Sequence, residues 1–258
     1  MRRKLIRFVS LLLAGALLMA VGGIATATLA GAGAKAPRAV HPRPAPKYDP
    51  ARFSARISNA WYPLKPGVVY VYKGRDGNKR SRDVLKPTDR VAKIDGVPCR
   101  VVNDKVYLNG VLHERTLDYY TQDAEGNVWY FAEDTAELDK NGNVTSTAGT
   151  WRTGRNGAEA GIFMQANPQV GDTFQQEFYR GHAEDHYQVL SLKAEVTVPY
   201  GHFGQNALRR NVELTKEWSP LEPNVRDHKV YVRGIGTVKE KTVRGGRELL
   251  KLVKIKKR

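Results

Sequence analysis

Imidazole and carboxylate side chains are concentrated in one short stretch of this 258-residue chain, His182-Ala183-Glu184-Asp185-His186. Imidazole nitrogens and carboxylate oxygens are common protein ligands of Zn²⁺ and other divalent ions, and the same groups act as general acids and bases. The stretch is therefore the first candidate for chemistry. It predicts a divalent-metal site or an acid/base group made by His182, Glu184 and His186.

The residues that follow the cluster indicate how it would be positioned. Apolar and polar residues alternate over residues 190–198, as in a strand with one buried face. Counted backward, this alternation places all three candidate side chains on the inner face. Residues four apart on a strand are about 13 Å apart, so one ion would need a bend and further ligands, such as Asp118. A hydrogen-bonded pocket lining, or an exposed turn after Gly181, is the competing interpretation.

Aromatic residues offer a second candidate site. The chain has 12 Tyr, 7 Phe and 4 Trp, most of which core packing explains. In a strand, Trp129 and Phe131 would share one face and Tyr130 would take the other, so one set could line an interior cavity. We predict that Asp118 and Trp129 bind a ligand together with the histidine cluster.

The elements that must position these residues have a period of two. Pairs of segments rich in β-branched and aromatic residues flank Asp95-Gly96, Asn109-Gly110 and the turns around Gly126 and Gly142, as expected for hairpins. Later strands are expected at residues 174–178, 187–198, 208–215, 229–233, 237–243 and 249–255. Successive hairpins predict an all-β fold, an antiparallel meander that forms a barrel or a strongly curled half-barrel.

The amino-terminal region predicts export. Residues 1–34 combine a basic start, an uncharged apolar block and small residues at Ala25-Thr26-Ala27, which is typical of a signal peptide. An uncleaved N-terminal anchor is the alternative, because the uncharged run is long enough to span a membrane. Residues 35–56 form a basic, proline-rich linker. Residues 57–258 are then expected to form a single β-rich domain with a basic C-terminal end.

The formal net charge of +16 is unevenly distributed along the chain. Residues 57–238 carry 23 basic and 23 acidic residues, whereas residues 239–258 carry nine basic residues and two acidic ones. This predicts a neutral folded body with two basic ends. Basic ends favour attraction to an anionic cell-envelope polymer or a lipid surface, and simple solubility is the alternative. No specific nucleic-acid binding is expected, since the folded body has no net positive charge.

Cys99, the only cysteine, excludes an internal disulfide. Its apolar surroundings in the sequence, Val97-Pro98-Cys99-Arg100-Val101, indicate a small buried hydrophobic residue and not a reactive thiol.

Several phrases of the sequence together resemble a functionally uncharacterised family of exported bacterial β-rich proteins. They lie at residues 59–67, 118–131, 181–186, 198–201, 217–223, 228–231 and 234–240. The resemblance covers about residues 57–255 and implies an exported β-rich domain. It implies no activity, ligand or catalytic residue.

These features predict an exported β-domain that binds a small apolar or amphiphilic ligand, or an envelope component, without catalysis. The sequence lacks the hydrolase signatures G-x-S-x-G, H-E-x-x-H and S-x-x-K, which removes the commonest hydrolase motifs without excluding all hydrolases. Two alternatives stay open. One is a divalent-metal-dependent hydrolase centred on His182, Glu184 and His186, and the other is a structural envelope protein without a pocket.

Overall fold

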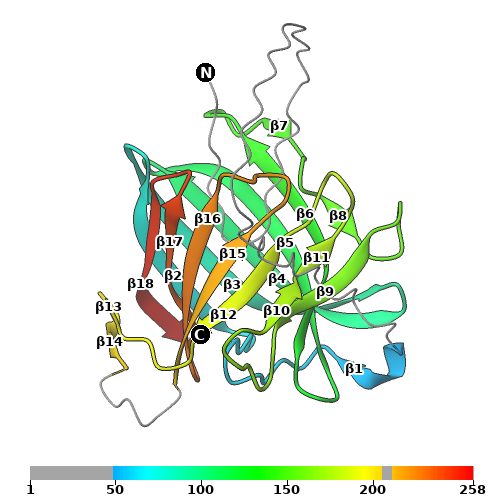
Figure 1. The fold of residues 1–258 in the computed structure, drawn as a ribbon. Coiled ribbons are helices and arrows are strands. Elements are labelled where there is room, and N and C mark those ends of the chain that lie inside the picture. Colours follow the sequence, from blue (N-terminus) through cyan, green and yellow to red (C-terminus); the bar gives the residue numbers. More distant parts are fainter. Residues whose placement is uncertain (1–48, 205–210, 258) are drawn as a thin grey trace, which may run out of the picture.

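The computed structural model describes residues 49–204 and 211–257, so the predicted signal segment and most of the predicted linker lie outside the described residues. Among those residues, no helix has the length and hydrophobicity needed to cross a bilayer. The regular structure is one short 3-10 helix and a series of strands (Figure 1). The elements are η1 (Pro50–Arg52), β1 (Phe53–Ser54), β2 (Val68–Asp76), β3 (Lys79–Ile94), β4 (Val97–Leu108), β5 (Val111–Asp123), β6 (Val128–Leu138), β7 (Val144–Ser146), β8 (Trp151–Arg152), β9 (Glu159–Met164), β10 (Thr173–Gln175), β11 (Glu177–Phe178), β12 (His186–Ser191), β13 (Val196–Val198), β14 (Gly201–Phe203), β15 (Val212–Trp218), β16 (Arg226–Val232), β17 (Gly236–Arg244) and β18 (Glu248–Lys257).

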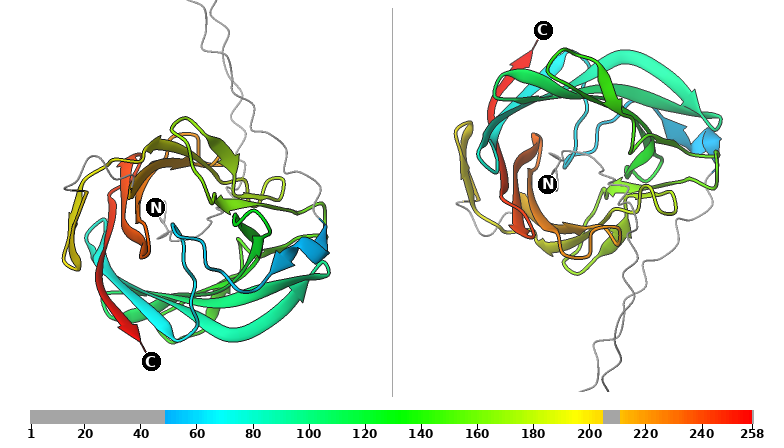
Figure 2. Two further views of the ribbon diagram at one scale, coloured as in Figure 1. Left: turned by 90° about the horizontal axis from the view of Figure 1, so that it is seen from below. Right: turned by 90° about the horizontal axis from the view of Figure 1, so that it is seen from above.

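The strands confirm the predicted all-β meander. One antiparallel sheet has the strand order β10-β12-β15-β16-β17-β18-β2-β3-β4-β5-β6-β9-β11, so neighbours in sequence are mostly neighbours in space. Pairing of β18 with β2 joins the C-terminal strand to the first long strand. Viewed along its axis, the sheet curls into a nearly complete ring (Figure 2).

One short segment brings the two ends of this sheet together. β10 pairs with β12, and β11, which follows after a single residue, pairs with β9. The intervening Gln176 donates its backbone N–H to the Asp185 carbonyl at 2.7 Å. A segment that changes partners therefore joins the two ends of the sheet, and the ring is nearly closed.

The predicted hairpins are present where the turn chemistry requires them. Asp95 and Gly96 have φ of 47° and 81°, and Asn109 and Gly110 have φ of 51° and 90°. Two consecutive positive φ values define the type I′ turn, which fits the twist of an antiparallel hairpin. These turns connect β3 to β4 and β4 to β5.

The interior of the ring is filled by the segment between β1 and β2, which we call the strap (residues 57–67). Figure 2 shows this part of the chain running inside the wall. The Tyr62 ring contacts Tyr120 of β5, Phe163 of β9 and Tyr231 of β16, with ring centroids 4.6–6.4 Å apart. These contacts reach several sides of the wall, so the strap is part of the main core.

Asn59 holds the strap in place. Its Oδ1 accepts hydrogen bonds from the backbone N–H groups of Trp61 and Tyr62, and its Nδ2 donates to the carbonyls of Gly126 and Gln165. The sequence phrase that begins at Asn59 thus has a structural purpose: it fixes the strap against the turn between β5 and β6.

A second apolar cluster lies on the other face of β4, β5 and β6. Phe53 packs edge-on against Trp129 and Phe131 there, at centroid distances of 5.7 and 5.5 Å. Tyr130 points to the main core instead. The predicted alternation of these aromatic residues is confirmed, and η1 and β1, upstream of residue 57, contribute to the fold.

The single long strand predicted over residues 187–198 is wrong. β12 ends at Ser191, after an irregularity in its pairing with β15 between Val189 and Ser191, and β13 is a separate three-residue strand that pairs only with β14. The apolar alternation of the sequence therefore runs across two elements with different partners.

Candidate functional site

The predicted histidine cluster is not one site. His182 is exposed, in the turn that Gly181 begins with φ of 74°, and it stacks on Tyr179 at 4.3 Å. Glu184 accepts a hydrogen bond from the Gly181 backbone N–H at 2.7 Å. The extended conformation therefore starts at His186, and the expected inner face shared by all three side chains does not exist.

His186 is buried, but on the other side of the wall from the main core. Tyr187 and Val189 of β12 belong to that core, whereas His186 stacks on Trp218 at 5.5 Å. Its Nδ1 lies 2.8 Å from the Glu184 carbonyl oxygen, and burial lowers the pKa of the ring below its ordinary value. The sequence prediction counted the alternation backward from residues 190–198 across the irregularity in β12. It therefore assigned His186 to the wrong face of the sheet. Among the described residues, no group of three or more His, Cys, Asp or Glu side chains is arranged to hold a metal ion.

Asp118 and Trp129 are also separated. Asp118 points inward and accepts a hydrogen bond from the Tyr130 hydroxyl at 2.7 Å, while Trp129 lies in the second cluster and donates its Nε1–H to Asp123 at 2.8 Å. Because they lie on opposite faces of β5 and β6, they do not line one site.

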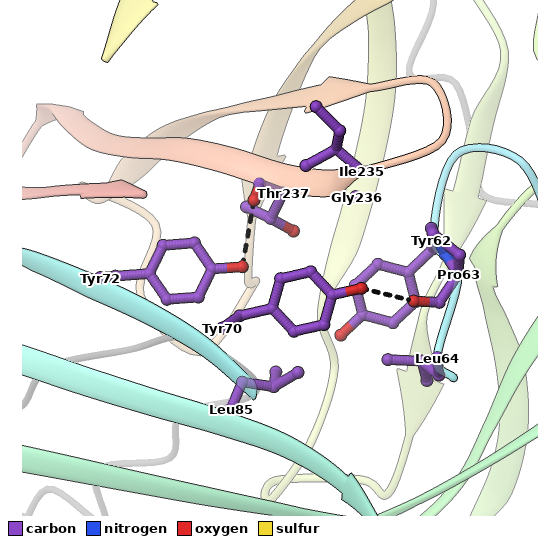
Figure 3. Close-up of a pocket in the computed structure, with 9 residues that line it drawn as sticks. All are labelled: Tyr62, Pro63, Leu64, Tyr70, Tyr72, Leu85, Ile235, Gly236 and Thr237. Atoms are coloured by element: carbon purple, nitrogen blue, oxygen red, sulfur yellow. Dashed lines mark hydrogen bonds between the residues drawn. The ribbon is translucent and has the colours of Figure 1, made fainter. Parts of the chain in front are cut away.

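The pocket in Figure 3 is small and its polar groups are satisfied. Its cavity volume is about 10 Å³, roughly the room needed by one water molecule and far too little for a small-molecule ligand. The Tyr70 hydroxyl donates to the Pro63 carbonyl at 3.1 Å, and the Tyr72 hydroxyl donates to the Thr237 carbonyl at 3.0 Å. These residues pack the strap against the wall and offer little room to a ligand.

Charge is divided sharply between the two sides of the wall. Nine of the 26 acidic residues are buried, whereas Lys229 is the one buried residue among the 31 described lysines and arginines. The described residues therefore present 30 basic and 17 acidic side chains at least partly to solvent. The buried acidic residues are Asp83, Asp104, Asp118, Glu133, Glu177, Glu213, Glu217, Glu240 and Glu248.

Four of these carboxyl groups lie on consecutive strands, β3 to β6. The pKa values of Asp83, Asp104, Asp118 and Glu133 are all raised, chiefly because burial disfavours the charged form. Asp118 and Glu133 face each other in the β5–β6 register, and the Tyr130 hydroxyl reaches both, at 2.7 and 3.1 Å.

The opposite part of the wall contains the buried lysine. Lys229 Nζ lies 2.7 Å from Glu217 Oε2, and both side chains are nearly inaccessible. Burial alone would lower the pKa of Lys229, but Glu217 and Glu240 raise it above its ordinary value. Glu213 differs: burial, then the carboxylates of Glu217 and Asp172, raise its pKa to about 8.

Lysines and arginines that point outward from neighbouring strands form a surface that we call the basic face. On β15, β16, β17, β18, β2 and the first half of β3, acidic residues occupy the inward positions and most basic residues lie on the outward alternation, as in Lys239-Glu240-Lys241 and Arg82-Asp83. The residues of the basic face are Lys73, Arg75, Arg80, Arg82, Lys216, Lys239, Lys241, Lys251 and Lys254.

Strand register aligns these cations across the sheet. Lys239 pairs with Lys251, Lys251 with Lys73, and Lys73 with Arg82, which makes a row of four cations on four neighbouring strands. Neighbouring strands are about 4.8 Å apart, so the row places adjacent positive charges close together. We call these four residues the cationic row.

A second row lies two residues along the strands. It begins with the pair Arg80 and Arg75 on β3 and β2, and Leu249 of β18 interrupts it. Beyond Leu249 it continues with Lys241 on β17, His228 on β16 and Lys216 on β15. Burial, then repulsion from Lys251 and Lys241, lowers the pKa of Lys239. The repulsion that acts on Lys239 shows that the positive charges of neighbouring strands lie close to it.

The interpretation of the folded body as neutral is therefore wrong for its surface. The sum over residues 57–238 is zero, but strand alternation hides carboxyl groups inside and exposes cations outside. Alternating charges in short phrases such as Lys216-Glu217 were the available signal in the sequence. Seven of the nine basic residues of 239–258 belong to β17 and β18, so they are part of this wall.

Comparisons with known proteins give fold-level similarity only. No protein-family model and no curated protein matches the sequence. A solved structure from Bacteroides fragilis, provisionally named as an exported protein with a YmcC-like fold, is 14% identical, with 76% of this chain and 99% of that chain covered and a TM-score of 0.43. A provisionally named lipoprotein from Parabacteroides distasonis is 11% identical, with 76% and 98% covered and a TM-score of 0.38. Similarity at this level carries no information about function.

Proposed function

We propose that this protein is an exported, noncatalytic β-barrel domain that binds a linear anionic polymer of the cell envelope through the basic face. The observation that carries the proposal is the cationic row, in which Lys239, Lys251, Lys73 and Arg82 adjoin one another on four strands. Export follows from the signal-like residues 1–34.

Electrostatics favours a polyanion as the partner. Clustered cations on one face raise the local concentration of anions and gain free energy when a polymer releases its bound counterions. On these six strands, counted up to residue 87 of β3, no acidic residue lies on the outward alternation to compete for the cations.

The curvature of the wall favours a polymer over a membrane. The two rows together extend from β15 to β3, and Figure 2 shows these strands following the curve of the ring. A flat anionic bilayer would touch only the part of a convex wall nearest to it, whereas a flexible chain can follow the rows from strand to strand.

The interior supports a noncatalytic role less directly. The strap fills the barrel, and the histidine and carboxylate residues predicted to do chemistry are dispersed over both faces of the wall. A small apolar ligand finds little space in the described pocket.

Fluorescence anisotropy of labelled sodium polyphosphate tests the proposal. The row variant, K73Q/R82Q/K239Q/K251Q, should bind at least about 100-fold more weakly than the natural protein, because each cation near an anionic surface contributes about 1 kcal/mol. The control variant K93Q/K140Q/R155Q/K193Q removes four exposed cations elsewhere and should bind nearly as well as the natural protein.

Two results would contradict the proposal. Equal weakening in both variants would mean that net charge alone, not the cationic row, drives binding. Binding to phosphatidylglycerol vesicles without measurable binding to polyphosphate would mean that the face recognises a lipid surface.

A further inference from the structure

Asp83 and Asp104 form a carboxyl pair inside the wall. Asp83 is on β3 and Asp104 on β4, and the register that pairs Asp83 with Val106 places the two aspartates two residues apart on neighbouring strands. Both belong to the inward alternation, with exposures of 0% and 4%. The diagonal spacing of an antiparallel pair brings such side chains within reach of each other.

The hydrogen bonding of the pair is incomplete when both groups are ionised. Neither oxygen of Asp83 has a donor, and Oδ1 of Asp104 has none. The two carboxyl groups do lie within hydrogen-bonding reach of each other, but two carboxylates are both acceptors, so the contact needs a proton. Buried polar groups without partners are costly, which favours a state in which one group donates.

Among the residues that the structure describes, no ion pair joins either aspartate to a cation. Carboxylates face it from β17 and β5, namely Glu240 and Glu114, and Asp118 of β5 is repelled by Asp104. Besides burial, the negative charge of the pair raises the pKa of the Tyr72 hydroxyl of β2, and that of Asp104 raises the pKa of the Tyr62 hydroxyl of the strap. Lys229 is engaged by Glu217.

The two members of the pair are not equivalent. Asp104 receives a hydrogen bond from the Lys105 backbone N–H, which stabilises its charged form, and no comparable bond reaches Asp83. Asp83 therefore carries the proton, and its O–H donates a hydrogen bond to the Asp104 carboxylate.

We propose that Asp83 holds a proton at neutral pH and donates it to Asp104, so that a single shared proton joins β3 to β4 inside the barrel. Loss of this proton at alkaline pH leaves two adjacent negative charges with no proton between them. The pair is thus a pH-sensitive latch: it holds the wall together at neutral and acidic pH and weakens it as the pH rises.

Infrared spectroscopy with ¹³C-labelled aspartate tests the assignment. At neutral pH the C=O stretch of a protonated aspartic acid should appear in the natural protein and lose intensity in Asp83→Asn. It should persist in Asp104→Asn, because the amide oxygen introduced by that substitution can still accept from protonated Asp83. Equal intensity in the natural protein and Asp83→Asn would overturn the proposal, and loss in Asp104→Asn alone would reverse the assignment.

A second measurement does not depend on the folding of Asp83→Asn. Unfolding Glu213→Gln, which lacks another carboxyl group that is neutral in the fold near pH 7, in a weakly buffered solution at pH 7 should release about one proton or more per chain, since an unfolded aspartic acid is ionised there. Proton uptake, or no exchange, would overturn the proposal even if Asp83→Asn failed to fold.

Discussion

Replacing Glu213 by Gln should make the barrel more stable at alkaline pH. Glu213 is fully buried on β15, neither of its carboxylate oxygens has a donor, and its pKa is raised from 4.5 to about 8 by burial and by Glu217 and Asp172. A carboxyl group with a raised pKa binds its proton more tightly in the folded state. The contribution of Glu213 to the free energy of unfolding is therefore fully present below pH 4.5 and is lost as the pH rises toward 8.

The size of the effect follows from the pKa shift. Each unit is equivalent to about 1.4 kcal/mol, so the rise from 4.5 to about 8 represents at most about 5 kcal/mol. Glutamine keeps the shape of the side chain and does not titrate. The free energy of unfolding of Glu213→Gln should match that of the natural protein near pH 4.5 and exceed it by several kcal/mol above pH 8.

Urea unfolding at a series of pH values between 4.5 and 8.5 measures this difference. Glu159→Gln, which removes an exposed carboxyl group of β9, serves as the control and should leave the pH dependence unchanged. If Glu213→Gln loses stability with rising pH as steeply as the natural protein, Glu213 is not a neutral buried acid and the reasoning fails.

Three further predictions concern other buried groups. Lys229→Met should destabilise the protein by about 3–5 kcal/mol in urea unfolding, because Glu217 loses its buried partner, and adding Glu217→Gln should restore part of the loss; an unchanged midpoint for the single variant would contradict this. Asn59→Ala removes four hydrogen bonds that fix the strap and should cost about 2–4 kcal/mol, which thermal denaturation can measure; a loss below about 0.5 kcal/mol would show that the strap is held by packing alone. Cys99 is fully buried and its pKa is raised to about 12, so a thiol reagent at pH 8 should label it only after unfolding; rapid labelling of the folded protein would refute this burial.

The hairpins could be predicted because their signals are local. Asp95-Gly96 and Asn109-Gly110 need only their own positive φ values to turn the chain, and the strands that flank them follow. The all-β meander is the sum of such local signals.

The face of His186 could not be predicted, because it depends on pairing between distant strands. One irregularity in the register between β12 and β15 is enough to exchange the inner and outer positions, and it leaves no mark in the composition. The basic face was missed for a different reason: adding charges over a segment discards the alternation that decides which side of a strand each charge occupies. The near closure of the ring creates an interior, and it depends on two adjacent short strands that pair with different neighbours. Thr173–Gln175 pairs with β12, whereas Glu177–Phe178 pairs with β9.

The salt dependence of polyphosphate binding tests the central claim most directly. At the counterion release typical of a single-stranded polyanion, about 0.7 per cation, the plot of log K against log salt should be shallower by about 3 for K73Q/R82Q/K239Q/K251Q than for the natural protein. The K93Q/K140Q/R155Q/K193Q control should keep the natural slope. Identical slopes for the natural protein and the row variant would contradict the account, since the cationic row would then make no contact with the polymer.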